Sequence, residues 1–121
     1  MRRWNPAVSK LCSTVNPNPH MRESAIEKKV AEWAKSRGIL CYKFVSPQQR
    51  GVPDRMFVLP YGTVCFIEFK QPGKKPTPLQ CAEIKKLNGH GVRAIWCDNA
   101  EIAIAHLGDW LLEDKDNDQI L

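Results

Sequence analysis

Two acidic residues and a lysine stand at the ends of two β-rich runs, where they could act together. The runs 54–59 and 63–70 are separated by a Pro-Tyr-Gly turn, a pattern that predicts a β-hairpin. If the hairpin turns on these three residues, Asp54 lies directly opposite Glu68, with both side chains on one face. Lys70, two residues further along, shares that face because side chains alternate along a strand.

This arrangement favours binding of a cation and a phosphate. Two carboxylates that face each other across a sheet repel, so they require a compensating positive charge. Lys70 supplies one charge, whereas a divalent metal supplies two and prefers hard oxygen ligands. The alternative is that Asp54 and Glu68 are solvated strand ends and that Lys70 forms an ordinary ion pair. A register slip of one residue would also turn the two acids to opposite faces.

The rest of the chain predicts the elements that must position these residues. Hydrophobic periodicity, caps and turn residues indicate a helix opened by a Ser24–Glu27 capping box and stopped at Gly38, strands over 40–45 and 92–97, and helices over 78–88 and 100–112. The order is α-β-β-β-α-β-α. Since the last strand follows a helical crossover, we predict an α/β fold, a restriction-endonuclease-like mixed sheet flanked by helices.

The domain boundaries follow from the same pass along the chain. Residues 1–20 lack periodicity and are rich in proline near their end, so we expect a flexible extension, either native or left by cloning. The folded domain is expected over 21–112, and 113–121 is expected to be a loose acidic tail. The sequence contains no signal-peptide pattern and no long apolar run, which favours an intracellular protein without a membrane partner.

Charge is distributed unevenly along the chain. The net charge is +5, but residues 22–93 hold 14 Lys or Arg against six Asp or Glu, whereas 98–118 hold seven acids and one lysine. A basic body favours a polyanionic partner, and nucleic acid is the expected one. Charge alone is weak evidence, because solvated lysine faces are common.

Several other chemistries are excluded by the residue types. The three histidines, His20, His90 and His106, lack the spacing of zinc ligands. No phosphate-binding G-x-x-x-x-G-K-[ST] motif is present, which argues against a nucleotide cofactor. The five cysteines form no C-x-x-C pair, so we interpret them as reduced thiols of the core.

The ordered motifs resemble a known nuclease family. Pro53-Asp54 and Glu68-Phe69-Lys70 resemble the two elements of PD-(D/E)XK nucleases. With the flanking segments 22–27, 42–47 and 72–80, the pattern resembles the VRR-NUC family in its compact stand-alone form, over about residues 21–98.

The resemblance implies roles for individual residues. Asp54 and Glu68 would hold Mg²⁺ or Mn²⁺ together with the backbone carbonyl of Phe69, and Lys70 would orient or deprotonate the attacking water. The family also carries a glutamate on its first helix. Glu27 is our choice for that residue, with Glu23 as the alternative.

Further site residues complete the prediction. Gln80 occupies the family's glutamine position and is expected near the phosphate. A tyrosine follows this glutamine by four residues in related exonucleases, whereas this chain has Ile84, which weakens an exonuclease analogy. DNA contacts are expected from the basic residues and the helix N-cap around the site, namely Arg50, Arg55, Lys74, Lys75 and Thr77.

The expected activity is a metal-dependent DNA endonuclease. The resemblance implies a structure-selective enzyme that cuts branched DNA, such as a Holliday junction, as a homodimer, because two strands need two active sites. Trp96 and Trp110 are candidates for the dimer interface, or they belong to the core. The alternatives are a DNA-binding module with a degenerate site and a nickase that reads sequence, although we find no inserted helix for base readout.

Overall fold

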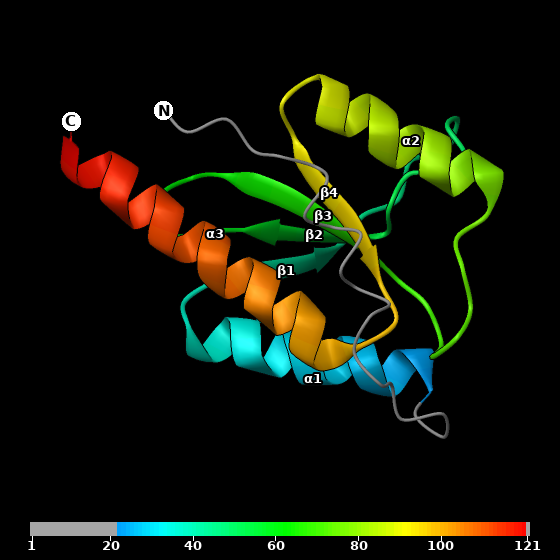
Figure 1. Cartoon of the computed structure of the whole chain (residues 1–121), viewed down its shortest axis with the longest axis horizontal. Helices are drawn as coiled ribbons and strands as arrows, with labels where there is room; N and C mark the ends of the chain where they lie inside the picture. Colours follow the sequence, from blue (N-terminus) through cyan, green and yellow to red (C-terminus); the bar gives the residue numbers. More distant parts are fainter. Residues whose placement is uncertain (1–21, 121) are drawn as a thin grey trace.

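The computed structural model describes residues 22–120, with side chains described for 22–116. The expected extension, residues 1–20, lies outside the described residues, as do Met21 and Leu121. The described elements follow one another in the predicted order (Figure 1). They are α1 (Glu23–Ser36), β1 (Leu40–Lys43), β2 (Arg55–Val58), β3 (Val64–Phe69), α2 (Pro78–Gly89), β4 (Arg93–Cys97) and α3 (Ala100–Ile120).

The strands form one mixed sheet in the order β1-β2-β3-β4. β1, β2 and β3 are antiparallel neighbours, and β4 runs parallel to β3 after the α2 crossover. In the hairpin Arg55 pairs with Ile67, and the Leu59 amide donates to the Thr63 carbonyl at 2.9 Å. The predicted mixed α/β sheet and the predicted hairpin register are both confirmed.

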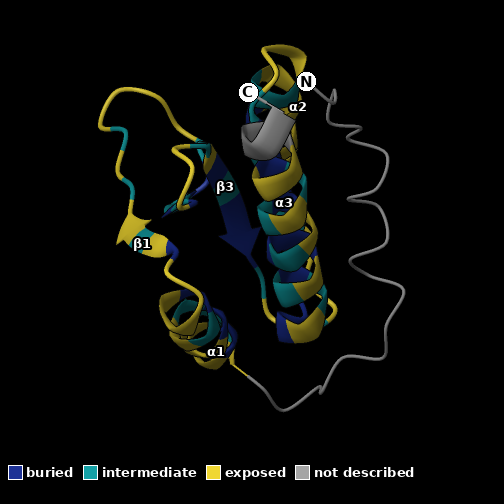
Figure 2. Ribbon diagram, turned by 90° about the vertical axis from the view of Figure 1, so that its left-hand side faces the viewer, coloured by how far each residue is buried: buried dark blue, intermediate teal, exposed yellow. Residues whose placement is uncertain are grey.

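The hydrophobic core lies between one face of the sheet and the helices α1 and α3. Every second strand residue points into it, among them Phe57, Ile67 and Ile95, because side chains alternate between the two faces of a sheet. Helix α1 adds Ile26 and Val30 at helical spacing. In Figure 1, β4 runs between α2 on one side and α1 with α3 on the other. Figure 2 shows β3 as a buried strand and β1 as an exposed edge strand.

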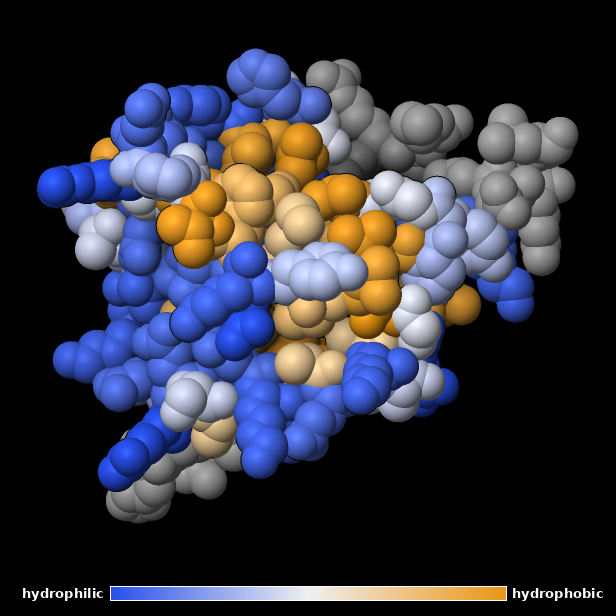
Figure 3. Space-filling model, turned by 180° about the vertical axis from the view of Figure 1, so that it is seen from behind, coloured by the Kyte–Doolittle hydropathy of each residue, from blue (hydrophilic) through white to orange (hydrophobic). Residues whose placement is uncertain are grey.

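The other face of the sheet is only partly covered. Leu40 and Tyr42 of β1 are 52% and 50% exposed, and Val64 of β3 is 38% exposed. Figure 3, which views the molecule from behind, shows apolar side chains gathered on this face. By alternation along the strands, Asp54 and Glu68 belong to this second face, which α2 covers in part. The acid pair therefore lies on the side of the sheet that α1 and α3 leave uncovered.

The start of the first helix differs from the prediction. Helix α1 begins at Glu23 with Arg22 at the N-cap, and no side chain caps it. Ser24 therefore lies inside the first turn and cannot form the predicted capping box with Glu27. The Glu27 carboxylate instead lies 3.4 Å from the guanidinium of Arg55 on β2, a partner that is distant in the sequence.

The last helix is longer than predicted. It was expected to end near Leu112, before a loose acidic tail, but α3 continues to Ile120. Buried Arg93 on β4 donates to Glu113 and to Asp114, each at 3.0 Å. A buried guanidinium is costly without acceptors, so these two carboxylates make the first part of the tail an integral element of the fold.

No helix in residues 22–120 is both long enough and apolar enough to cross a bilayer. Cys41, Cys65 and Cys81 are free thiols, but Cys81 is exposed on α2, so the prediction that the cysteines belong to the core is wrong for that residue. Burial raises the pKa of Cys65 to about 12, so that thiol stays protonated and unreactive at neutral pH. Cys12 lies outside the described residues.

Candidate active site

The geometry of the hairpin brings Asp54 and Glu68 together. The last ladder pair of β2 and β3 is Arg55 with Ile67, so the next positions, Asp54 and Glu68, face each other. Because Leu59 hydrogen-bonds to Thr63, and hydrogen-bonded and non-hydrogen-bonded pairs alternate, the acids occupy a non-hydrogen-bonded pair. Side chains approach most closely in such a pair.

The same register leaves the Phe69 carbonyl uncommitted. Phe69 faces Pro53 at the next hydrogen-bonded position, but proline has no N–H group to donate. The neighbouring Lys70 amide donates to the Cys97 carbonyl of β4 at 2.8 Å, which indicates that the Phe69 carbonyl points the other way, toward β2. The proline before Asp54 thus leaves a backbone oxygen available next to the two carboxylates.

Glu68 is a buried acid with a perturbed ionisation. It is 6% exposed, and its partner in the parallel ladder is Trp96, an aromatic side chain on the same face. Burial, reinforced by the charges of Asp54 and Glu23, raises the pKa of Glu68 to about 7. The Lys70 ammonium opposes this shift and lies 3.9 Å from a carboxylate oxygen of Glu68. Because this pKa is close to neutral pH, a cation placed beside Glu68 would shift the carboxyl group to its ionised form.

The donor set fits a hard divalent cation. The Asp54 Oδ1 atom is buried and has no hydrogen-bond partner among the described residues, which is costly for a carboxylate. A cation between Asp54 and Glu68 would relieve that cost, and the Phe69 carbonyl would be a third oxygen ligand. Within the described chain, no three His, Cys, Asp or Glu side chains converge enough to hold a metal. A metal here would therefore depend on two carboxylates, a backbone oxygen and water.

Helix α1 presents two glutamates with different surroundings. Glu27 pairs with Arg55. Burial and the charges of Glu27 and Asp54 raise the pKa of Glu23, whereas the charge of Lys70 lowers it. Glu23, the alternative in our sequence prediction, is therefore electrostatically coupled to the acid pair and to Lys70, whereas Glu27 pairs with Arg55, which by strand alternation lies on the opposite face of β2 from Asp54.

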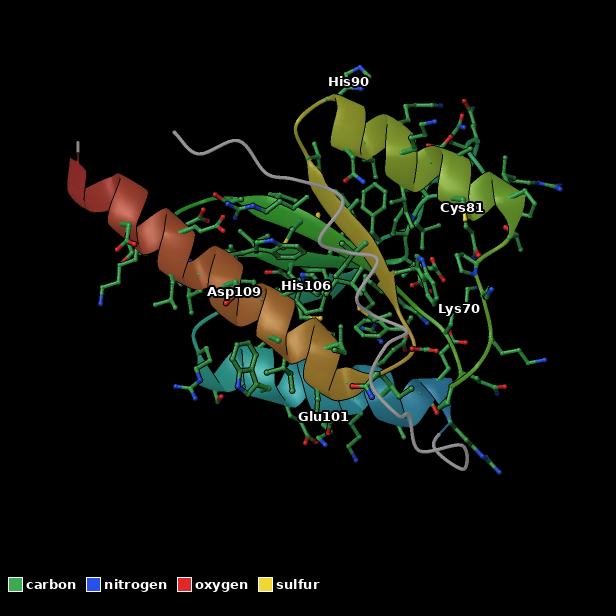
Figure 4. The ribbon with its side chains drawn as sticks, in the orientation of Figure 1. Lys70, Cys81, His90, Glu101, His106 and Asp109 are labelled. Carbon is green, nitrogen blue, oxygen red and sulfur yellow. The ribbon has the colours of Figure 1, made fainter. Side chains whose placement is uncertain are left out.

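Three lysines follow the end of β3, at positions 70, 74 and 75. Figure 4 shows Lys70 beyond the strand, between α2 and the N-terminal half of α1. The segment that follows, residues 71–77, contains the exposed Lys74 and Lys75 and is called the lysine loop below. It ends at Thr77, the N-cap of α2.

Gln80 has a structural partner in the present conformation. Its side chain accepts from the Thr77 amide at 2.9 Å, and its own amide donates to the Thr77 hydroxyl at 3.2 Å. These two bonds form a capping box at the start of α2. The geometry therefore assigns Gln80 to the helix terminus that borders the site.

A second loop, residues 46–53, leads into Asp54 and is fixed to α2. The Gln49 amide donates to the buried Glu83 carboxylate at 2.6 Å. Gly51 has φ +85°, and a Cβ there would lie 2.8 Å from the Leu79 carbonyl oxygen, so only glycine fits. The exposed Arg50 lies between these two anchors. Of the predicted DNA contacts, Arg50 is thus open to solvent, while Arg55 is engaged with α1.

Three residues near the site were not predicted as site residues. Trp96 is the ladder neighbour of Glu68, Glu83 accepts from Gln49 of the 46–53 loop, and buried Asp98 accepts from the Gly73 amide of the lysine loop at 3.2 Å. Trp96 could have been found from the ladder register. The other two depend on contacts between distant segments and leave no local sequence signal.

Comparison with known proteins agrees with this architecture. No family model matches the sequence. The chain is 43% identical over 83 residues to "Putative nuclease p44" of Acyrthosiphon pisum secondary endosymbiont phage 1, an alignment that covers 69% of this chain and 89% of the phage protein. It is also similar to a solved structure described as "VRR_NUC domain", with a TM-score of 0.65, 25% identity, and coverage of 72% of this chain and 94% of the other. The chain therefore belongs to the VRR-NUC family of nucleases.

Proposed function

We propose that the protein is a metal-dependent DNA endonuclease that hydrolyses phosphodiester bonds, with a preference for branched DNA. The observation that carries this proposal is the cross-strand pair of half-buried Asp54 and buried Glu68, with the Lys70 ammonium 3.9 Å from Glu68. Phosphodiester hydrolysis needs a cation next to the negative charge on the phosphate oxygens. It also needs a water molecule placed in line with the leaving oxygen.

The proposed roles of the residues follow from their places in the site. Asp54, Glu68 and the Phe69 carbonyl would hold Mg²⁺ or Mn²⁺, which when bound lowers the pKa of a bound water and neutralises charge on the phosphate. The Lys70 Nζ atom donates a hydrogen bond to the attacking water and orients it. Trp96, the neighbour of Glu68 in the parallel ladder, would help to keep bulk water from Glu68, which would strengthen the electrostatic interactions around it.

A cleavage panel tests the proposed activity. The substrates are duplex, flap, splayed-arm and four-way junction DNAs, each with Mg²⁺, Mn²⁺ or EDTA. We expect metal-dependent internal cuts, fastest on a branched substrate. DNA binding without cleavage under any metal condition would instead indicate a DNA-binding module with a degenerate site, and cuts at one sequence in every substrate would indicate a nickase that reads sequence.

The helix-one acid is proposed to be Glu23 rather than Glu27. Glu23 is electrostatically coupled to Asp54, Glu68 and Lys70, whereas Glu27 faces Arg55. We expect Glu23→Gln to slow cleavage more than Glu27→Gln does under the same metal concentration. The reverse order of the two single-turnover rates would return the assignment to Glu27.

The lysine loop is proposed to bind phosphates beside the site. Lys74 and Lys75 are exposed near the N-terminus of α2, whose free N–H groups also favour anions. Replacing both with alanine should reduce the slope of log affinity against log salt by about two. The matched control is Lys28→Ala with Lys35→Ala, two exposed lysines of α1. Equal slopes in the two double variants would show that the loop lysines are only solvated charges.

The proposed quaternary state is a homodimer, because one domain of this size supplies a single centre and a branched junction needs two cuts. Of the two alternatives for Trp110, the core is the one that the structure supports, since the side chain is 2% exposed and packs beside His106 and Arg93. Trp96 is half-buried on the sheet.

We expect light scattering at micromolar concentration to give twice the chain mass, and mixing with excess Asp54→Ala subunits to convert paired junction cuts into single nicks. A monomer that still makes paired symmetric cuts, with and without junction DNA, would contradict the dimer.

A further inference from the structure

Asp98 is a buried acid that has no role in the proposed reaction. It follows β4 directly and is 4% exposed. Its Oδ2 atom accepts a hydrogen bond from the Gly73 amide at 3.2 Å, and its Oδ1 atom is buried with no hydrogen-bond partner among the described residues. An ionised carboxylate buried with a single neutral donor costs more free energy than an apolar residue of similar size. Packing alone therefore does not account for an acid at this position.

Asp98 lies at the end of β4, next to the end of β3 that carries Lys70. The parallel ladder pairs Phe69 with Cys97, and the Lys70 amide continues that ladder by donating to the Cys97 carbonyl. One step further along the same register places Asp98 beside Lys70. Asp98 also lies just before the N-terminal end of α3, which starts two residues later at Ala100 and favours a negative charge.

The bond from Gly73 fixes the middle of the lysine loop. Within the loop, the Lys74 amide donates to the Gln71 carbonyl at 2.9 Å, and Gly73 adopts φ +83°. This turn directs the Gly73 amide to Asp98, while Lys74 and Lys75 remain exposed. The loop is thus closed on itself by one bond and attached to the end of β4 by another. The attachment determines where the two lysines lie relative to Lys70.

We propose that Asp98 is a positioning residue that attaches the lysine loop to β4 and so holds Lys74 and Lys75 where they reach the phosphates next to the reaction centre. The part that concerns DNA rests on the proposed function, whereas the attachment itself does not. Asp98 acts through the Gly73 amide and does not touch the reacting atoms. Asparagine at position 98 retains a carbonyl acceptor for that amide, and alanine does not.

The attachment is tested without DNA. Hydrogen exchange on the unmodified protein should show the Gly73 amide protected relative to the exposed Lys75 amide. Limited trypsin digestion should cut the Lys74–Lys75 bond about tenfold faster in Asp98→Ala, the scale of effect expected for losing a hydrogen bond to a charged acceptor. Asp98→Asn should be cut at close to the wild-type rate. An unprotected Gly73 amide in the unmodified protein would overturn the proposal whether or not the variants fold.

The effect on DNA is tested by a double-mutant cycle on the full chain. Asp98→Ala should raise KM for DNA with little change in kcat, and it should reduce the salt slope by up to about two. It should have no further effect when Lys74 and Lys75 are already alanine. Asp109→Ala, an exposed acid on α3, is the control for the change in net charge. An equal loss of affinity with and without the two lysines would overturn the positioning role. Absence of any DNA binding by the unmodified protein would refute the proposed function and leave the trypsin result to decide the attachment.

Discussion

Replacing Asp54 with asparagine should reduce the rate of DNA cleavage by about 10³-fold or more while leaving DNA affinity within a few-fold of the wild type. The substitution keeps the size of the side chain and removes its charge. It thereby removes one of the two carboxylates that the proposed metal requires. The Asp54 Oδ1 atom has no hydrogen-bond partner among the described residues, so the change breaks no bond of that atom. Single-turnover rates on a four-way junction, measured beside binding titrations in Ca²⁺, separate the two effects.

A matched control tests whether the loss is specific to the acid pair. Glu32→Gln neutralises an exposed acid on α1 and should cut at the wild-type rate. Removal of either acid lowers the repulsion of phosphate, so both variants should bind DNA at least as tightly as the wild type. Wild-type cleavage by a folded Asp54→Asn protein would show that the reaction centre lies elsewhere.

The part of the site that the sequence predicted is the part that local chemistry determines. The turn between β2 and β3 fixes the hairpin register, and the register alone places Asp54 opposite Glu68. The period of two then places Lys70 beside them. No long-range information was needed, because both strands and their turn lie within 17 consecutive residues, 54–70.

The parts that were missed depend on contacts between distant segments. Ser24 has the residue type of an N-cap, but Arg22 occupies the cap and Glu27 pairs with Arg55, 28 positions away. The acidic tail has the composition of a loose segment, yet part of it folds because Arg93 is buried and must be neutralised. A pattern in one segment cannot show which distant partner will satisfy it.

Residue type also left the role of Trp110 open. Tryptophan is common both in cores and at the centres of interfaces, and the sequence offered no way to choose. The structure buries this side chain in the core cluster next to Arg93. Glu23 and Glu27 posed a similar choice, because both lie on one side of the same helix and differ only in their distant partners, Asp54, Glu68 and Lys70 for Glu23 and Arg55 for Glu27.

Replacing Glu68 with glutamine should stabilise the metal-free protein at pH 8 by up to about 3 kcal/mol. The folded-state pKa of Glu68 is about 7, raised from 4.5 by burial and by Asp54. Below pH 4.5 the carboxyl group is neutral in both the folded and the unfolded chain, so it costs no stability. Between pH 4.5 and pH 7 the carboxyl group ionises in the unfolded chain but stays largely protonated in the folded chain, so ionisation lowers the free energy of the unfolded chain alone. The wild type therefore loses stability over this interval, and glutamine, which does not ionise, avoids the loss.

Urea unfolding in EDTA at pH 4 and pH 8 measures this effect, with Glu32→Gln as the control that should match the wild type at both values. The expected difference between Glu68→Gln and wild type is small at pH 4 and largest at pH 8. Added Mn²⁺ should then stabilise the wild type at pH 8 through the ionised pair and stabilise Glu68→Gln much less. A stability difference that is the same at both pH values would mean that the substitution changes packing and not ionisation. A pH-dependent difference that Mn²⁺ leaves unchanged would confirm the raised pKa of Glu68 but contradict the metal site. The two carboxylates would then repel each other without binding the cation that they are proposed to hold.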